Sequence, residues 1–164
     1  MTQLDPASNH NGGDIVVLPD GRLIVSTGDS GGSGDPQNAA QDLGSLLGKL
    51  LLVDPSSDSP SVRIVARGLR NPWRIALEPL SGNLWIADVG QDTIEEIDRI
   101  PVTSLTMAGE TIANFGWPIL EGDACFRMSK CTPPDSYQPP IAVYRHSPGC
   151  SVIGGAVAQD RYLF

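Results

Sequence analysis

Two segments of this chain follow one hairpin pattern, and that repeat limits the fold more than any other feature of the sequence. One covers residues 15–28 and the other covers residues 75–90. Each has two short apolar runs on either side of a turn that contains a glycine, Gly21 or Gly82, a pattern typical of β-hairpins. A period of about 60 residues built from short antiparallel strands predicts blades of a β-propeller. The alternative is two unrelated hairpins that share common turn residues.

Further apolar runs predict strands along most of the chain, and the sequence as a whole predicts an all-β fold. Strands are expected at 15–18, 23–27, 49–53, 63–66, 75–77, 84–87, 96–100, 141–144 and 152–157. A short helix is expected only at 38–47. The 18 glycines and 14 prolines, with 40% hydrophobic residues, suit short strands joined by turns. A closed propeller has 4–8 blades, so the chain is expected to be part of one or to close by self-association.

The charge of the chain excludes some classes of partner. A net charge of −8 argues against binding to nucleic acid or to an anionic membrane surface. The surplus carboxylates serve either solubility or calcium binding. No apolar run has the roughly 18 residues of a membrane span, and the first residues do not form a signal peptide.

Histidine is scarce, and one of the two copies lies where packing in a core does not explain it. His10 sits within Asn9-His10-Asn11-Gly12-Gly13. A histidine on such a loop is either a proton-transfer group or an ordinary turn residue. His146 is interpreted as part of a loop, with a role in lining a site as the alternative.

Several motifs occur in a fixed order and carry a resemblance to a known family. They are Asn9-His10-Asn11-Gly12-Gly13, Gly28-Asp29, Leu46-Leu47-Gly48-Lys49, Gly68-Leu69-Arg70-Asn71-Pro72-Trp73-Arg74, Asp88-Val89-Gly90-Gln91-Asp92, Glu95-Glu96-Ile97 and Asn114-Phe115-Gly116-Trp117-Pro118. In order and spacing they resemble the glucose/sorbosone dehydrogenase family, the soluble quinoprotein aldose sugar dehydrogenases that use pyrroloquinoline quinone and calcium. The resemblance implies a six-bladed β-propeller, of which residues 1–164 form about the central half, roughly three blades of a single domain.

The resemblance also implies an activity and assigns residues to it. The expected reaction oxidises an aldose to its lactone, with hydride passing to the quinone and electrons leaving to an acceptor. His10 matches the catalytic base, and Arg70 and Asn71 match the pair that lies against the quinone. The backbone carbonyls of Gly90 and Gln91 match the ligands of the calcium ion that holds the quinone. Neither the sugar nor the acceptor follows from the sequence.

A second, structural calcium site is implied at Glu96 and the carbonyl of Phe115. Its remaining carboxylate is either Glu121 or Asp123. The alternative interpretation of Glu95 and Glu96 is that they are surface charges on a strand.

Two further residues are expected near the sugar, and here the chain departs from the pattern. Asn9 stands where better-known relatives place an aspartate that orients the base, and an amide cannot stabilise a protonated imidazole as a carboxylate does. Asp29 is either a turn former or part of the sugar pocket. Gln91 replaces a proline of some relatives. The later lysine and arginines that grip the cofactor's carboxylates, and the first two blades, lie outside this chain, so the chain alone is expected to be inactive.

The three cysteines bear on the compartment. A disulfide between Cys125 and Cys131 would close a short loop, consistent with a periplasmic or secreted protein, and Cys150 would then be free or paired elsewhere. Three reduced thiols are the alternative.

Two other functions compete with the enzyme. One is a non-catalytic propeller module that binds a protein or glycan, although its relatives lack the histidine and arginine motifs found here. The other is a lactonase-like calcium propeller, which needs a set of carboxylates on inner strands that the sequence does not show.

Overall fold

Two antiparallel sheets form the body of the molecule, seen here in a computed structural model that describes residues 7–164 except 57, 108, 110, 148 and 159–160. The first sheet has the order β1-β2-β3-β4-β8. Its strands are β1 (Ile15–Val17), β2 (Leu23–Thr27), β3 (Lys49–Asp54), β4 (Ser61–Arg67) and the short parallel β8 (Ala113–Asn114). The second sheet has the order β11-β7-β6-β5. Its strands are β5 (Pro72–Glu78), β6 (Asn83–Asp88), β7 (Ile94–Pro101) and β11 (Ala142–Arg145).

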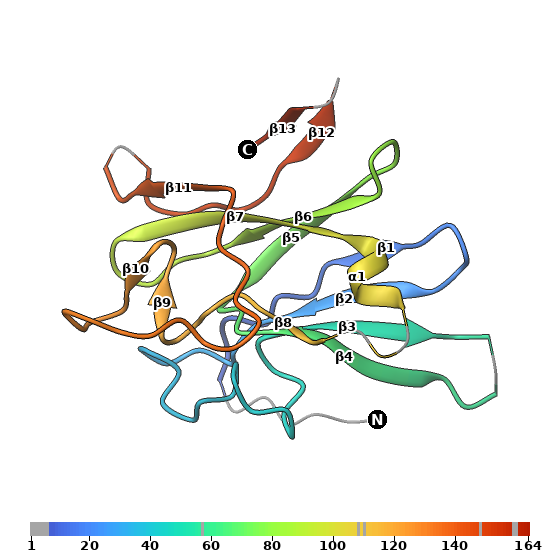
Figure 1. Cartoon of the computed structure of the whole chain (residues 1–164), viewed down its shortest axis with the longest axis horizontal. Coiled ribbons are helices and arrows are strands. Elements are labelled where there is room, and N and C mark those ends of the chain that lie inside the picture. The colour runs from blue at the N-terminus through green and yellow to red at the C-terminus, as the bar shows by residue number, and fades with distance from the viewer. Residues whose placement is uncertain (1–6, 57, 108, 110, 148, 159–160) are drawn as a thin grey trace.

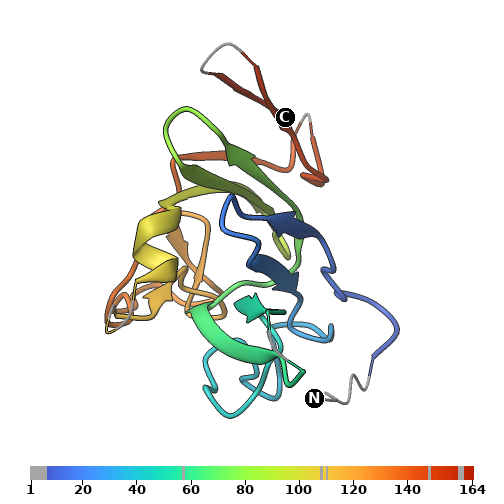
Figure 2. The ribbon, with the colours of Figure 1, turned by 90° about the vertical axis from the view of Figure 1, so that its right-hand side faces the viewer.

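Smaller elements complete the fold around these sheets. They are the helix α1 (Val102–Thr106), the pair β9 (Leu120–Glu121) and β10 (Ala124–Cys125), and the hairpin β12 (Ala156–Ala158) and β13 (Arg161–Leu163). The two large sheets lie one above the other (Figure 1), and the β12–β13 hairpin lies beyond the second sheet in both views (Figures 1 and 2). Trp85 of β6 stacks on Tyr162 of β13 with ring centroids 5.0 Å apart.

The repeated pattern of the sequence corresponds to the same strand pair in each large sheet. Hairpin β1–β2 pairs Ile15 with Val25, and hairpin β5–β6 pairs Ile75 with Ile86. Gly21 and Gly82 occupy the two turns with positive φ, which glycine adopts without steric cost. Each sheet therefore begins with one copy of the repeat, as the sequence predicts.

Apolar side chains from both sheets fill the space between them. Ile24 and Leu50 of the first sheet and Leu84 and Ile86 of the second are fully buried in this core. Alternation along each strand sends every second residue into it. The opposite face of the first sheet is also apolar, because Val25 pairs with both Ile15 and Leu51 across neighbouring strands. Apolar residues on both faces are typical of a sheet inside a stack of sheets.

The helix expected at 38–47 does not form, and that expectation is wrong for an electrostatic reason. Asn38 has a positive φ of 53°, which interrupts helical geometry. The Asp35 carboxylate instead accepts the backbone N–H groups of Ala39 and Ala40 at 2.9 and 2.8 Å. The Lys49 Nζ donates to the carbonyls of Ala39, Ala40 and Leu47 at 2.7, 3.0 and 2.6 Å. Side-chain charges therefore satisfy the backbone groups that a helix would pair internally.

Lys49 is fully buried, and burial lowers the pKa of its ammonium to about 8. We expect Lys49→Met to lower the free energy of unfolding by about 3 kcal/mol, because three buried carbonyls lose their donor. Urea unfolding measures the change. Lys130→Met, at an exposed lysine, is the matched control. Equal stability of the two variants would contradict the anchoring role of Lys49.

Two other expectations need correction. Of the strand expected at 152–157, only 156–157 belong to a strand, because Val152 donates its N–H to the Glu95 carboxylate and Gly154 has a φ of 139°. Helix α1 falls in a segment for which no helix was expected. The described residues form two sheets with at least four strands each and one further hairpin, in agreement with the expected partial propeller of roughly three blades. In the part of the chain that the structure describes, no helix is long and apolar enough to cross a membrane.

Candidate functional site

His10 lies between a carboxylate and a guanidinium. Its Nδ1 is 2.8 Å from Asp29 Oδ1, and its Nε2 is 3.1 Å from Arg70 Nη2. Because arginine only donates hydrogen bonds, Nε2 must be the unprotonated nitrogen of a neutral ring. Nδ1 then carries the hydrogen and donates it to Asp29. The two neighbours therefore fix one tautomer, with the basic nitrogen turned toward Arg70.

Asp29 is the residue that orients His10, and its side chain is fully buried. Its Oδ1 also accepts the Gly31 N–H at 2.8 Å, and its Oδ2 accepts the Trp117 Nε1–H at 2.8 Å. The interpretation of Asp29 as a turn former therefore applies, and its contact with the histidine is an additional finding, whereas its place in a sugar pocket stays a prediction. The orienting role expected of Asn9 falls to Asp29, and the Asn9 side chain lies against Gly31 instead.

A backbone contact sets the position of His10. A Cβ placed on Gly28, at the end of β2, would overlap the His10 carbonyl oxygen. A Cβ on Gly12 would lie 2.8 Å from the Gly28 nitrogen, also too close, and His10 itself has a positive φ of 56°. Gly28 and Gly12 are therefore required by close packing of two chain segments, whereas Gly13 has no such neighbour and a positive φ of 100°.

Arg70 is 7% exposed and contacts three successive residues that follow β6. Its Nη1 donates to the carbonyls of Val89 and Gly90 at 2.7 and 2.6 Å, and its Nε and Nη2 lie 3.4 and 3.3 Å from Gln91 Oε1. The guanidinium also lies over the Trp117 ring, 5.6 Å from its centroid. Burial lowers the pKa of Arg70, although the group remains charged at neutral pH.

The two carbonyls predicted as calcium ligands match only partly the pair of carbonyls that converges on Arg70. Gly90 and Gln91 were expected to direct their carbonyls at calcium, whereas the carbonyls of Val89 and Gly90 converge on one cationic nitrogen. Gln91 contributes its side-chain oxygen to the same guanidinium. Carbonyl oxygens that converge on a positive charge are suited to a hard cation such as calcium.

Asn71 connects the histidine loop to the second sheet. Its Oδ1 accepts the Gly12 N–H at 3.3 Å. Its backbone N–H donates to Asp88 Oδ1 at 2.6 Å, and the Arg70 N–H donates to Asp88 Oδ2 at 2.9 Å. The carboxylate of Asp88 therefore holds the turn that presents both Arg70 and Asn71.

The two carboxylates expected as alternatives beside Glu96, Glu121 and Asp123, both have protein partners in the structure. Glu121 Oε1 accepts the N–H groups of Gln91, Asp92, Thr93 and Ile94 at 2.8, 2.6, 2.9 and 3.3 Å. Although burial alone would raise the pKa of Glu121, these four bonds hold it below its usual range. The Asp123 side chain is 57% exposed and lies 3.9 Å from Arg145. The expectation that Asp123 is a metal ligand is therefore not supported.

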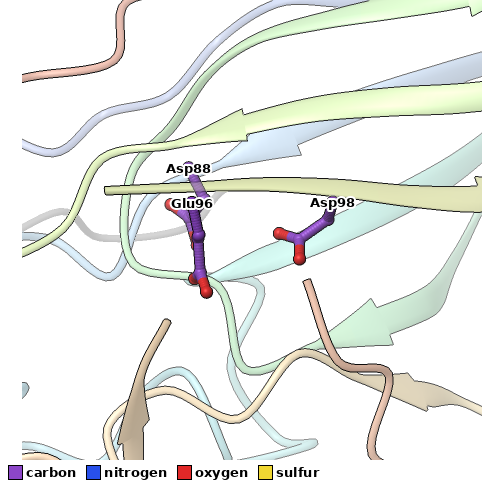
Figure 3. A group of neighbouring side chains, drawn as sticks. All are labelled: Asp88, Glu96 and Asp98. Atoms are coloured by element: carbon purple, nitrogen blue, oxygen red, sulfur yellow. The ribbon is translucent and has the colours of Figure 1, made fainter. Parts of the chain in front are cut away.

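Glu96 instead belongs to a group of three buried carboxylates with Asp88 and Asp98 (Figure 3). Asp88 pairs with Glu96 across β6 and β7, and Asp98 follows Glu96 on the same face of β7. One oxygen of each residue lies within 4.8 Å of the others. Glu96 Oε2 and both Asp98 oxygens have no hydrogen-bond partner.

Burial raises the pKa of all three carboxyl groups, and the charges of neighbouring acids raise them further. Burial, and then the charge of Asp98, hold the pKa of Glu96 well above its usual range. Burial and Asp88 do the same to the pKa of Asp98, and burial raises the pKa of Asp88 to about 7. The alternative interpretation of Glu95 and Glu96 as surface charges is wrong, because both are buried.

Other residues of the motifs occupy supporting positions. Phe115 is buried in the core between the sheets, and its N–H donates to the Arg67 carbonyl at 2.9 Å. His146 lies 2.5 Å from Glu95 through Nε2, away from the His10 contacts. The disulfide Cys125–Cys131 forms as the spacing allowed, and Cys150 is free and exposed.

Sequence reasoning did not assign Trp117, Asp88 or Asp98 to the site. A local signal existed for the acidic pair, since Glu96 and Asp98 at alternate positions must share one face of a strand that otherwise carries isoleucines.

Comparison with known proteins gives consistent results for sequence and structure. The HIPL2 protein of Arabidopsis thaliana is 34% identical over 92% of this chain and 26% of its own length. The aldose sugar dehydrogenase YliI of Escherichia coli is 31% identical over 68% of this chain and 29% of its own length. The PQQ-bound aldose sugar dehydrogenase of Streptomyces coelicolor superposes with a TM-score of 0.65 at 28% identity, covering 90% of this chain and 39% of that one. This chain therefore spans less than half of each of these relatives.

These similarities confirm the predicted fold. The two large sheets and the β12–β13 hairpin are part of a β-propeller of the quinoprotein sugar dehydrogenase type. A sequence profile described as Glucose / Sorbosone dehydrogenase matches residues 2–160. The chain belongs to the glucose/sorbosone dehydrogenase family.

Proposed function

We propose that this chain carries the proton-accepting half of a sugar dehydrogenase that depends on pyrroloquinoline quinone and calcium. The observation that carries the proposal is the line of contacts from Asp29 through His10 to Arg70. A buried carboxylate that orients a neutral imidazole is the arrangement that general-base catalysis requires. The membership of the chain in a sugar dehydrogenase family gives this base a substrate class, a small-molecule aldose.

Each side chain has a separate task in the proposed reaction. His10 Nε2 accepts the proton of the sugar's anomeric hydroxyl, and the Asp29 carboxylate stabilises the imidazolium that results. The sugar hydroxyl replaces Arg70 Nη2 as the partner of Nε2. Arg70 then directs its charge at the negative charge that develops on the cofactor. The quinone, when bound, supplies the atom that accepts the hydride and later passes the electrons to an acceptor.

The donor set of the site fits this cofactor and its metal. Arg70 is a buried cation of the kind that binds an anionic quinone, and Asn71 lies next to it. Calcium would be held by the backbone carbonyls of Gly90 and Gln91, and the Gly90 carbonyl would exchange its Arg70 Nη1 donor for the ion. The carboxylates Asp88, Glu96 and Asp98 would hold a second calcium ion.

The proposed compartment is the periplasm or the outside of the cell. The Cys125–Cys131 disulfide supports it, because such bonds persist in oxidising environments.

Reconstitution tests the proposed function. The 164-residue chain is mixed with calcium and pyrroloquinoline quinone, and a chimera carries this chain in place of the matching segment of the Streptomyces coelicolor enzyme. We expect the chimera to bind the quinone, seen as its bound absorbance, and to reduce a dye with one or more aldoses. The chain alone should not reduce the dye, since it spans less than half of that enzyme.

Two outcomes would contradict the proposal. Full activity in the chain alone would show that the remaining blades are unnecessary. A folded chimera that binds a glycan but no quinone would favour the non-catalytic propeller module.

A further inference from the structure

The three buried carboxylates face the core, where apolar side chains are expected. In β6 the same face carries Leu84 and Ile86, and in β7 it carries Ile100, all fully or nearly fully buried. At one end of the two strands this face changes from apolar side chains to Asp88, Glu96 and Asp98. Like charges placed opposite one another in a sheet destabilise it, so these residues must either be protonated or have a positive partner.

No protein cation among the described residues fills that role for Asp98. Both of its oxygens are buried without a partner, as is Glu96 Oε2. Two ligands of one calcium ion, each at about 2.4 Å, can be at most about 4.8 Å apart. The ligand atoms of the three carboxylates lie within 4.8 Å of one another. The separation of the ligand atoms, their carboxylate chemistry and the oxygens without a hydrogen-bond partner all fit one hard cation between these three residues.

Asp88 gives this cation site a second connection. Its two oxygens already accept the backbone N–H groups of Arg70 and Asn71 at 2.9 and 2.6 Å. Carboxylate oxygens offer about four lone-pair directions, so these bonds leave room for a cation. The same carboxylate therefore touches both the cluster and the turn that presents the Arg70 guanidinium to His10.

We propose that a calcium ion bound by Asp88, Glu96 and Asp98 fixes the Arg70–Asn71 turn, so that occupancy of this buried site sets the position of the guanidinium beside His10. In this role Asp88 is a positioning residue, because it acts through the backbone of Arg70 and Asn71. Without the cation, only the N–H groups of Arg70 and Asn71 hold the Asp88 carboxylate. With the cation bound, the Asp88 carboxylate is held by the ion as well as by the N–H groups of Arg70 and Asn71.

The inference rests on the calcium-dependent function proposed above, but its test needs neither quinone nor sugar. The 164-residue chain is titrated with calcium chloride, with thermal unfolding as the first readout. NMR amide exchange of Arg70 and Asn71 is the second readout. We expect calcium to raise Tm and to slow exchange at these two amides by at least about tenfold, since their opening must then break a held carboxylate.

Two variants separate the cation site from its alternatives. Asp98→Asn keeps both Asp88 hydrogen bonds and removes a buried charge, so it should fold without calcium yet bind calcium at least about tenfold more weakly. Exchange at Arg70 and Asn71 should then no longer respond to calcium. Asp123→Asn, at the exposed carboxylate, should respond as the unmodified chain does.

The outcomes that overturn the inference are distinct. Calcium that raises Tm without changing exchange at Arg70 and Asn71 would refute the coupling. A calcium response lost in Asp123→Asn but kept in Asp98→Asn would place the site elsewhere, and no calcium binding at all would refute the site. If the chain shows the calcium effects but the chimera never binds quinone, the inference is upheld and the proposed function is refuted.

Discussion

Replacing His10 by alanine should lower the rate of dye reduction by the chimera about 10³-fold, which is the usual scale for loss of a general base. Asp29 contacts Nδ1 of the His10 imidazole, so the unprotonated nitrogen, Nε2, points away from the carboxylate. Quinone binding should be largely retained, because Arg70 and Asn71 remain. Steady-state kinetics with an aldose and absorbance of the bound quinone measure the two effects separately.

The other histidine provides the matched control for this experiment. His146 also contacts a buried carboxylate, Glu95, but it makes no contact with Arg70 or Asp29 among the described residues. His146→Ala should therefore retain dye reduction within a few-fold. Normal dye reduction by the His10→Ala chimera would refute His10 as the base.

Asp29→Asn should lower both stability and turnover. The carboxylate accepts three hydrogen bonds, from His10, Gly31 and Trp117. An asparagine that keeps its oxygen toward His10 directs its N–H groups at the Trp117 Nε1–H, so two donors face each other in a buried place. We expect a loss of about 2 kcal/mol in the free energy of unfolding and a 10²- to 10⁴-fold lower rate, roughly the scale known for misoriented catalytic imidazoles.

A double-mutant cycle tests the physical reason. Trp117→Phe removes the opposing N–H, so Asp29→Asn should cost less stability in that background than in the unmodified chain. Asp92→Asn, at an exposed aspartate paired with Arg127, is the surface control and should change stability little. Equal losses in both backgrounds would show that the Trp117 hydrogen bond is not the cause.

Local patterns predicted most of the strands because each depends on neighbours in sequence. The alternation of apolar residues and the turn glycines Gly21 and Gly82 determine the two repeated hairpins. Residues 38–47 show the limit of such patterns. Their backbone groups pair with Asp35 and with Lys49, and the lysine belongs to a strand that begins after the segment ends.

The site divides in the same way. The motifs point to His10, Arg70 and Asn71, and the structure brings these three residues together around Asp29 and Gly12. Asp123 was expected at a cation site because the family resemblance implies a carboxylate there, with Glu121 as the alternative. In the fold it is exposed beside Arg145, while Asp88 of the neighbouring strand β6 and Asp98 of the same strand lie next to Glu96.

The sequence by itself determined the hairpin repeat, the family and the histidine loop, because these depend on residue types at short spacing. Only the tertiary structure decided which carboxylate orients His10, what the Arg70 guanidinium contacts and which acids gather around Glu96. The reason is physical: hydrogen bonds and charge contacts depend on distances in space. The separations that matter here, such as 19 residues from His10 to Asp29 and 60 from His10 to Arg70, are set by strand pairing and sheet packing.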